Sequence, residues 1–151
     1  MRLGNMIITI CSSVDFTPKI KEITETLRAV GHTVHIPHYS QKIIDGEVTL
    51  EDYLKQKNKN GDAQMRAAAD HDLIKRHYNL IQNSNAILVV NCDKKGIKNY
   101  IGGNTFLEMG FAYVLNKKIF ILNPIPDIVM INDELKNINP VVLNNDLTLI
   151  L

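Results

Sequence analysis

Runs of β-branched and aliphatic residues recur along the chain and predict the strands of a parallel sheet. Met6–Cys11 and Ala86–Val90 are apolar at nearly every position, as expected for strands that are covered on both faces. Thr33–Ile36 and Ile119–Leu122 predict two further strands, each followed closely by a proline that cannot continue the ladder. Val141–Leu143 predicts a weaker fifth strand.

Between these strands, apolar residues recur at the spacing of helices. Thr17 is predicted to cap the first helix, with Pro18 at its first helical position and Gly31 as its C-terminal stop. Asn116 is suited to end a later helix in the same way. The other helical patterns run over residues 62–82, 104–115 and 133–137.

The alternation of strands and helices predicts an α/β fold in a single domain over residues 1–151. We expect one doubly wound, mostly parallel five-stranded sheet with helices on both faces, of the flavodoxin-like or Rossmann-like kind. Residues 38–61 are polar and predict a loop that carries a short helix. This segment is either a solvated excursion or a lid over a site.

The composition narrows the class of protein. The 151 residues are 45% hydrophobic and 22% charged, which fits one globular domain with its own core. With 17 Lys and Arg against 16 Asp and Glu, the net charge of +1 gives no support for a nucleic-acid polymer or a membrane as partner. Cys11 and Cys92 stand singly, without the spacing of a disulfide framework or a zinc site. No signal peptide or membrane-spanning run is visible, so we expect a cytoplasmic protein.

The expected sheet also predicts where a ligand binds. In open α/β sheets, ligands lie beyond the carboxyl ends of the strands, where the strand order reverses. This rule nominates Ser12–Ser13, the loop Asn91–Thr105 and the pair Asn123–Pro124. The N–H groups and hydroxyls of Ser12–Ser13 favour a phosphate, but serines are equally typical of a plain turn. The turn carries no glycine-rich dinucleotide or P-loop fingerprint.

Glu108 is the most prominent candidate for chemistry. It lies near the start of a predicted helix among apolar residues, and the partial desolvation expected there tunes a carboxylate to act as nucleophile or base. The alternative role is structural. Thr105 and Glu108 have the spacing of a capping box, in which the glutamate bonds back to the N–H of the cap residue.

Other polar residues have two interpretations each. His77 lies on the apolar face of the long predicted helix, either as a hydrogen-bonded core residue or as a catalytic group that Asp70 orients. Lys94, Lys95 and Lys98 form a basic loop that either attracts a phosphate or is simply solvated. No spacing among the histidines supports a metal site.

Two stretches resemble the nucleoside 2-deoxyribosyltransferase family, which includes relatives that hydrolyse deoxynucleoside monophosphates. They are Gly102–Ala112, with the sequence GGNTFLEMGFA, and Leu80–Asn91, with LIQNSNAILVVN. The resemblance implies that Glu108 is the nucleophile that attacks the sugar C1′. It also implies that the turn Cys11–Ser13 holds a 5′-phosphate, and that C-terminal segments of one subunit complete the site of a neighbour.

The chain departs from this family at three positions. The family has an aspartate where this chain has His77, often another where it has Gly102, and a glycine where it has Asn104. These differences concern the recognition of the base and its protonation as it leaves.

We therefore expect cleavage or transfer at the N-glycosidic bond of a (deoxy)nucleoside or nucleoside 5′-monophosphate, in the manner of a retaining glycosidase. Glu108 is the expected nucleophile, and His77 or Asp93 assists protonation of the departing base. The residues expected to bind the substrate are Cys11, Ser12, Ser13, Asn91, Gly102, Gly103, Asn104, Thr105 and Asn123. No cofactor and no metal ion is expected. The alternatives are a non-catalytic nucleotide-binding or sensing module, and a homo-oligomeric scaffold.

The last third of the chain predicts self-association. Residues 123–151 hold more apolar side chains than one short helix and one edge strand normally bury, and exposed apolar patches mark interfaces. We expect a homodimer or higher homo-oligomer, formed through this tail or through the helix of Glu108. The alternative is that Val141–Leu143 and Leu147–Leu151 fold back onto their own sheet.

Overall fold

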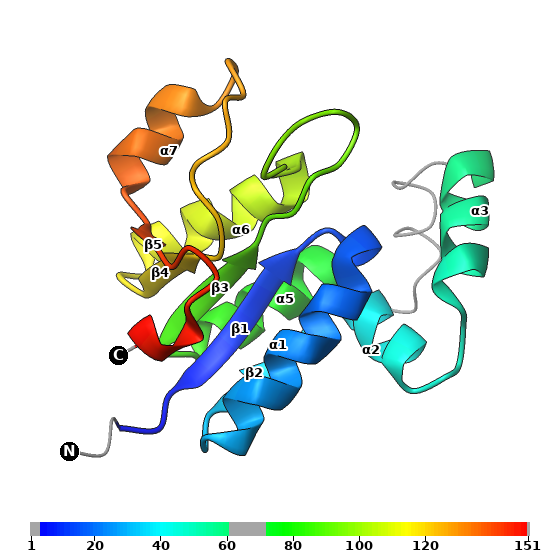
Figure 1. Ribbon diagram of the computed structural model, residues 1–151, viewed down its shortest axis with the longest axis horizontal. Coiled ribbons are helices and arrows are strands. Elements are labelled where there is room, and N and C mark those ends of the chain that lie inside the picture. Colours follow the sequence, from blue (N-terminus) through cyan, green and yellow to red (C-terminus); the bar gives the residue numbers. More distant parts are fainter. Residues whose placement is uncertain (1–3, 61–71, 151) are drawn as a thin grey trace.

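Five parallel strands form one sheet in the order β2-β1-β3-β4-β5 (Figure 1). This computed structural model describes residues 4–60 and 72–150. All of β3 is buried, as its unbroken apolar run predicts. The predicted α/β class and the doubly wound parallel sheet are confirmed. The strands are β1 (Ile7–Ser12), β2 (Thr33–His35), β3 (Ala86–Val90), β4 (Lys118–Ile121) and β5 (Val141–Val142).

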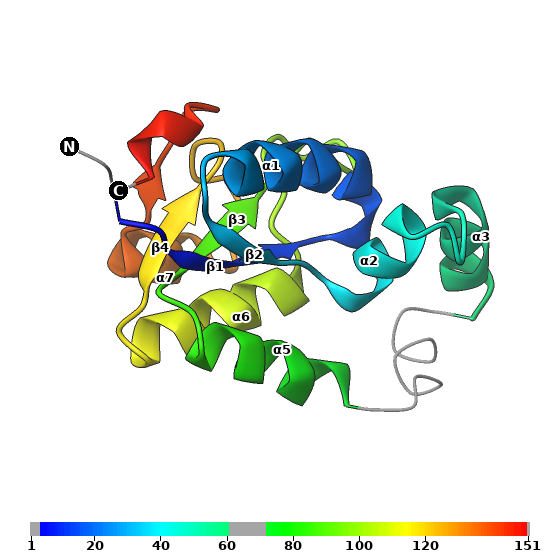
Figure 2. The same cartoon turned by 90° about the horizontal axis from the view of Figure 1, so that it is seen from below.

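Helices cover both faces of the sheet. α1 (Thr17–Ala29) lies on one face, and α5 (Leu73–Gln82) and α6 (Gly103–Val114) lie on the other (Figure 2). α7 (Asn132–Ile138) contributes Leu135 to the core on the side of α6. Because the chain leaves β1 toward one face and β3 toward the other, the carboxyl ends of these two neighbouring strands form the switch point of the sheet.

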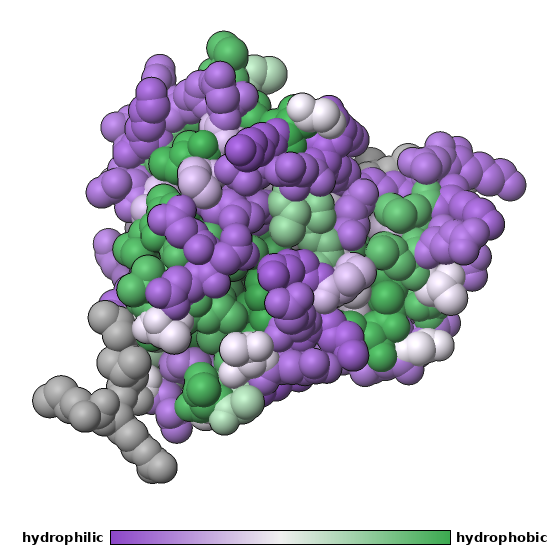
Figure 3. Space-filling view, viewed as in Figure 1, coloured by the Kyte–Doolittle hydropathy of each residue, from purple (hydrophilic) through white to green (hydrophobic). Residues whose placement is uncertain are grey.

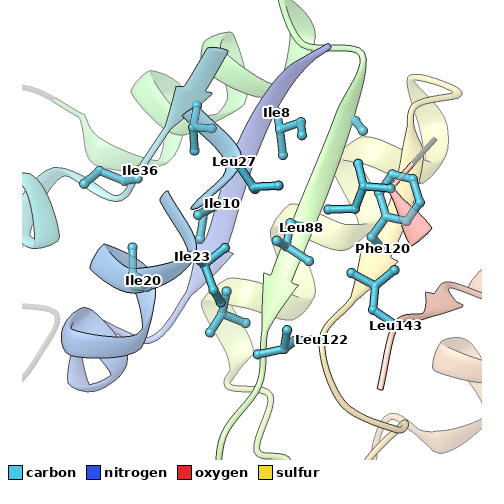
Figure 4. Packing of buried hydrophobic residues seen from close by; sticks show 14 of the residues in the cluster. Ile8, Ile10, Ile20, Ile23, Leu27, Ile36, Leu88, Phe120, Leu122 and Leu143 are labelled. Atoms are coloured by element: carbon cyan, nitrogen blue, oxygen red, sulfur yellow. The ribbon is translucent and has the colours of Figure 1, made fainter. Parts of the chain in front are cut away.

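The core on the α1 face is aliphatic and fixes the height of that helix over the sheet. Ile20, Ile23 and Leu27 are at most 2% exposed and pack with Ile10 and Leu88 (Figure 4). Each such side chain contributes about 1.5–3 kcal/mol relative to an exposed one. α1 therefore holds the turn that follows β1 in a fixed position.

The C-terminal segment folds back onto its own sheet. Leu143 and Ile150 are buried in the same cluster as α1, on either side of the 3₁₀ helix η2 (Leu147–Leu149). The folded-back alternative is confirmed for these two residues, which pack into the aliphatic cluster under α1. The expected exposed apolar side chains are present elsewhere in this third of the chain, at Val129, Met130, Val141 and Leu149.

The predicted helix stops are confirmed, but the predicted cap is not. Gly31 and Asn116 follow α1 and α6 with φ of +101° and +56°, the left-handed conformation that ends a helix. Thr17 is the first residue of α1 rather than its cap, and Phe16 holds the cap position without a side-chain hydrogen bond. The hydroxyl of Thr17 instead donates to the carbonyl of Val14, at the start of the 3₁₀ helix η1 (Val14–Phe16).

The polar segment after β2 is more ordered than a loop with one short helix. It forms α2 (His38–Ile44) and α3 (Leu50–Asn60), which lie beyond the end of β2 (Figure 1). α5 is described from Leu73, with Asp72 as its cap. The predicted helix start at Asp62 and the predicted role of Asp70 lie outside the described residues.

The exposed surface differs between the two faces. The face seen in Figure 3 is mainly hydrophilic, with smaller hydrophobic patches. On the opposite face, α6 exposes Leu107 and Val114, beside Phe106, Phe111 and Tyr78, and we name these five residues the α6 surface. None of the described helices is long and apolar enough to cross a membrane.

Candidate active site

A cavity of about 220 Å³ opens at the switch point between β1 and β3. Its walls come from segments that follow the carboxyl ends of the strands, together with the first turns of α5 and α6. The lining residues are Ser12, Ser13, Val14, Pro37, His38, Tyr39, Tyr53, Lys57, Leu73, Arg76, His77, Lys94, Lys95, Tyr100, Gly102, Gly103, Asn104, Thr105 and Glu108. The position agrees with the rule for ligand binding in open α/β sheets.

Glu108 lies at this cavity with its carboxylate held from both sides. The side chain is 5% exposed, and its Oε1 accepts a hydrogen bond of 3.0 Å from Nδ2 of Asn104, one turn earlier on α6. Its Oε2 lies 2.9 Å from Nε2 of His77 on α5. Packing of α5 against α6 therefore fixes the carboxylate, and two donors compensate for its burial.

The capping-box interpretation of Glu108 is wrong. α6 begins at Gly103 with Gly102 as its cap, so Thr105 lies within the first turn and cannot be the cap residue. The bonds of Glu108 go to two side chains instead of a backbone N–H. The helix therefore starts independently of this carboxylate.

His77 is both a buried, hydrogen-bonded residue and part of the cavity wall. Its Nε2 lies 2.9 Å from Glu108 Oε2 and 3.1 Å from the carbonyl oxygen of Ile10. Both neighbours accept hydrogen bonds, so this nitrogen carries a proton that it donates to them. The Sγ atom of Cys11 lies 3.7 Å from the same nitrogen. Burial and the charge of Glu108 raise the pKa of the Cys11 thiol well above its usual range.

The turn after β1 joins a network of cations. Nζ of Lys94 donates to Ser13 Oγ at 2.9 Å and lies 3.1 Å from a carboxylate oxygen of Asp15. Lys57 of α3 reaches the same oxygen at 3.4 Å. Burial alone would raise the pKa of Asp15, but the hydrogen bond from Lys94 and the two ammonium charges outweigh it and lower this pKa. One carboxylate thus faces two cations.

Cations exceed anions around the cavity. Lys57, Arg76, Lys94 and Lys95 line it, whereas Glu108 is the single carboxylate among the described lining residues. Burial, together with the charge of Lys57, lowers the pKa of Lys94 in spite of its bond to a carboxylate. An anionic group of a ligand would relieve this excess of positive charge, as phosphates do at many such clusters.

Aromatic rings from α2 and α3 form another wall. Tyr39 lies between His38 and Tyr53, with ring centroids 5.3 and 5.1 Å away. Tyr53 is 3% exposed and anchors α3 against the rest of the protein. The half-buried ring of Tyr39 offers flat apolar surface of the kind that stacks on a nucleobase.

The structure brings most of the predicted site residues together. Ser12, Ser13, His77, Gly102, Gly103, Asn104, Thr105 and Glu108 all line the cavity. Cys11 lies behind His77 and is fully buried. Of the predicted basic loop, Lys94 and Lys95 line the cavity and Lys98 does not.

Three predicted residues stabilise loops and are not among the lining residues. Asn91 is fully buried, and its side chain accepts from the N–H of Asn123 and donates to the carbonyls of Asn99, Asn123 and Pro124. The side chain of Asn123 donates in return to the carbonyl of Asn91. The carboxylate of Asp93 accepts from the N–H of Asn99. The bonds of Asn91 and Asn123 fasten the loops after β3 and β4 to each other, and the bond of Asp93 closes the loop after β3 on itself.

A lid over a site is one interpretation of residues 38–61, but no lining residue of α2, α3 or the first turn of α5 is predicted by name before His77. Tyr39, Tyr53, Lys57 and Arg76 reach the cavity from segments whose placement depends on packing. The sequence contains one signal for α3. Leu50, Tyr53, Leu54 and Lys57 have the spacing of residues on one face of a helix.

One group of side chains has donor atoms suited to a metal ion. Among the described residues, Cys11, His77 and Glu108 place a sulfur, a nitrogen and an oxygen within 4.8 Å of one another. All three side chains are buried. The sequence spacing gave no sign of this group, because each residue comes from a different element.

No protein-family model matches this chain, and a search of curated proteins gives no match either. The fold and the cavity define a class: an α/β protein of flavodoxin-like topology with a polar, cation-rich cavity at its switch point. Many functions occur on this topology, so the function has to be argued from the cavity itself.

Proposed function

We propose that the protein cleaves or transfers at the N-glycosidic bond of a (deoxy)nucleoside or nucleoside 5′-monophosphate, with Glu108 as nucleophile. The observation that carries the proposal is the buried carboxylate of Glu108, which two side-chain donors hold at a cavity on the switch point of the sheet. Its two oxygens are fixed in position before a substrate arrives, which lowers the cost of reaching an attack geometry. The resemblance to nucleoside 2-deoxyribosyltransferases supports the same role.

In the proposed reaction, an oxygen of Glu108 attacks C1′ of the sugar while the bond from C1′ to the base breaks. The electron pair of that bond leaves with the base, which takes up a proton from solvent, and a glycosyl ester forms on Glu108. Water or the nitrogen of a second base then attacks C1′, loses its proton to solvent and releases the carboxylate, which gives hydrolysis or transfer. We assign His77 to holding Glu108, because its Nε2 proton faces that carboxylate.

The rest of the cavity wall suits the phosphate and the base of a nucleotide. Ser13 and Lys94, with Lys57 beside them, would hold a 5′-phosphate through charge-assisted hydrogen bonds. The half-buried ring of Tyr39, which packs against the buried Tyr53, would contact the base by stacking. The excess of cations favours a monophosphate over a free nucleoside.

A second candidate function is the binding or sensing of a nucleotide without cleavage. One observation favours it: among the described residues that line the cavity, no carboxylate besides Glu108 is present to protonate a departing base. Retaining glycosidases use a second acidic group for this step. In this alternative, Glu108 accepts hydrogen bonds from the sugar hydroxyls.

The test is incubation with a panel of nucleosides and 5′-monophosphates, with and without an added acceptor base, followed by chromatography of the free base. We expect release from at least one monophosphate, and a loss of about a thousandfold or more in Glu108→Gln. The glutamine keeps the shape but cannot form the ester, so the stability should change by only about 1 kcal/mol.

Glu134→Gln, on the exposed side of α7, is the matched control. Binding without release by the wild type would favour the sensing function, and undiminished release by Glu108→Gln would exclude Glu108 as nucleophile.

We also propose a cytoplasmic location and self-association. Cys11 and Cys92 are both free thiols, which fits a reducing compartment. Leu107 and Val114 are 43% and 76% exposed, and the α6 surface around them is the apolar patch that we propose as the contact between two copies of the chain.

A further inference from the structure

Three side chains from three elements converge next to the cavity. Cys11 comes from β1, His77 from α5 and Glu108 from α6, and each is at most 7% exposed. Sγ of Cys11 lies 3.7 Å from Nε2 of His77, which lies 2.9 Å from Oε2 of Glu108. The proposed reaction uses Glu108 and its contact with His77, but it gives the thiol no role.

The donor set selects for one kind of metal ion. Mg²⁺ and Ca²⁺ prefer oxygen ligands, whereas a thiolate, an imidazole nitrogen and a carboxylate together are typical of Zn²⁺. Tetrahedral bonds of about 2.0–2.3 Å place neighbouring ligand atoms about 3.3–3.7 Å apart. The sulfur–nitrogen distance of 3.7 Å is already in this range, and the nitrogen–oxygen distance of 2.9 Å has to lengthen by a few tenths of an ångström.

We infer that Cys11, His77 and Glu108 form a Zn²⁺ site whose fourth position faces the cavity. On binding, the thiol proton of Cys11 is released to solvent, and the imidazole proton of His77 moves from Nε2 to Nδ1 so that Nε2 coordinates the ion. The carbonyl of Ile10 then loses the donor that lies 3.1 Å away in the metal-free protein. Three protein ligands with one open position are the arrangement of zinc ions that bind a further ligand.

Occupation of this site has a consequence for the proposed reaction. The oxygen of Glu108 that binds Zn²⁺ is no longer free to attack C1′, so zinc inhibits base release. This consequence depends on the proposed function, whereas the metal site itself does not.

The binding test uses metal-free protein and titrates Zn²⁺ against a chromogenic chelator. We expect one Zn²⁺ per chain in the wild type and in Cys92→Ala, which removes the other cysteine at a position outside the cluster. Cys11→Ala and Glu108→Gln should bind about tenfold more weakly or worse, since even changes in the shell around a metal cost about 10–100-fold. Circular dichroism confirms that each variant is folded.

Co²⁺ in place of Zn²⁺ tests whether the thiol is a ligand. A thiolate bound to Co²⁺ gives a charge-transfer band in the near ultraviolet, which should appear in the wild type and in Cys92→Ala and be absent in Cys11→Ala. Zinc affinity that is equal in the wild type and Cys11→Ala would place the ion elsewhere, and absence of binding would overturn the inference directly.

The outcome is separable from that of the proposed function. Base release is measured in chelator, without metal, so its absence there counts against the proposed reaction alone. Zinc binding is measured without substrate, so its absence counts against the metal site alone. If Glu108→Gln abolishes base release in chelator, then release that continues unchanged in zinc-saturated wild-type protein would overturn the placement of Glu108 among the ligands.

Discussion

Glu108 and His77 illustrate how single residues obtain their properties from neighbours on other elements. A carboxylate that is 5% exposed needs donors, and Asn104 and His77 supply them from two helices. Removal of one donor would leave the buried carboxylate with too few hydrogen bonds. The free-energy cost is therefore larger than that of losing a hydrogen bond at the surface.

His77 should act through the proton on Nε2. His77→Leu removes the donor and should lower turnover by about a hundredfold, with a smaller effect on KM. His77→Gln places an amide N–H near the same point and should restore most of the turnover. Steady-state kinetics on both variants checks this. Equal losses in the two variants would show that ring shape, rather than the hydrogen bond to Glu108, is what matters.

Lys94 should determine the preference for a phosphate. Lys94→Met keeps the aliphatic stem but removes the ammonium that contacts Ser13 and Asp15. We expect binding of a 5′-monophosphate to weaken by about 1.5–3 kcal/mol, the range of hydrogen bonds to charged groups, and binding of the nucleoside to change little. Calorimetry with both ligands measures the difference. Lys98→Met is the matched control, because Lys98 is exposed on the same loop and does not line the cavity. An equal loss for both ligands would argue against a phosphate subsite here.

At the scale of elements, α3 is joined to the body of the protein by charge as well as by packing. Lys57 of α3 and Lys94 of the loop after β3 meet at Asp15 in η1. Three segments far apart in the sequence therefore share one carboxylate. Because the side chains of Asp15 and Lys57 are only 23% and 22% exposed, solvent screens this contact less than a surface ion pair.

This contact predicts a dependence of stability on pH. The pKa of Asp15 in the folded protein lies below its ordinary value of 3.8, so the ionised carboxylate stabilises the fold above that pH. The contribution is lost as the pH falls through the folded pKa. Asp15→Asn should therefore lower the free energy of unfolding near neutral pH, and the gap to the wild type should shrink below about pH 3.8. Urea unfolding at a series of pH values measures the gap. A gap that is constant with pH would mean that the charge of Asp15 does not stabilise the contact.

At the scale of the whole molecule, the distribution of exposed apolar side chains decides where a second copy would bind. Leu143 and Ile150 of the C-terminal segment are buried in the core on the α1 face, whereas Val129, Met130, Val141 and Leu149 are at least 45% exposed. We propose the α6 surface as the contact, because its residues line one apolar hollow on the helix that carries Glu108. Contact there would couple assembly to the position of Glu108, the proposed nucleophile.

Leu107→Glu should dissociate the proposed dimer. The substitution places a charge at the centre of the α6 surface, where burial without a partner is costly. Light scattering should give twice the mass of one chain for the wild type and the mass of one chain for the variant. Val129→Glu is the control, because Val129 is 88% exposed and lies outside that surface. A wild-type protein with the mass of a single chain would contradict the prediction.

The sequence by itself determined the elements of the sheet and the edge at which the cavity opens. Strands such as Ala86–Val90 and stops such as Gly31 and Asn116 depend on local side-chain properties: β-branching, burial on both faces and tolerance of positive φ. The order of strands and helices then sets the topology. The placement of Glu108 and Ser13 at one edge follows from that topology alone, which is why sequence analysis anticipated it.

Only the tertiary structure decided which side chains meet. Asn91 and Asn123 look like ligand-binding residues in sequence, but these two residues, 32 positions apart, fold together so that each satisfies the other. Lys57 and Asp15, 42 positions apart, meet because α3 places Lys57 at the wall of the cavity. Cys11, His77 and Glu108 converge because α5 and α6 pack on the same face of β1. Periodicity reports which face of its own helix or strand a residue occupies, and contacts between elements depend on packing that no local pattern encodes.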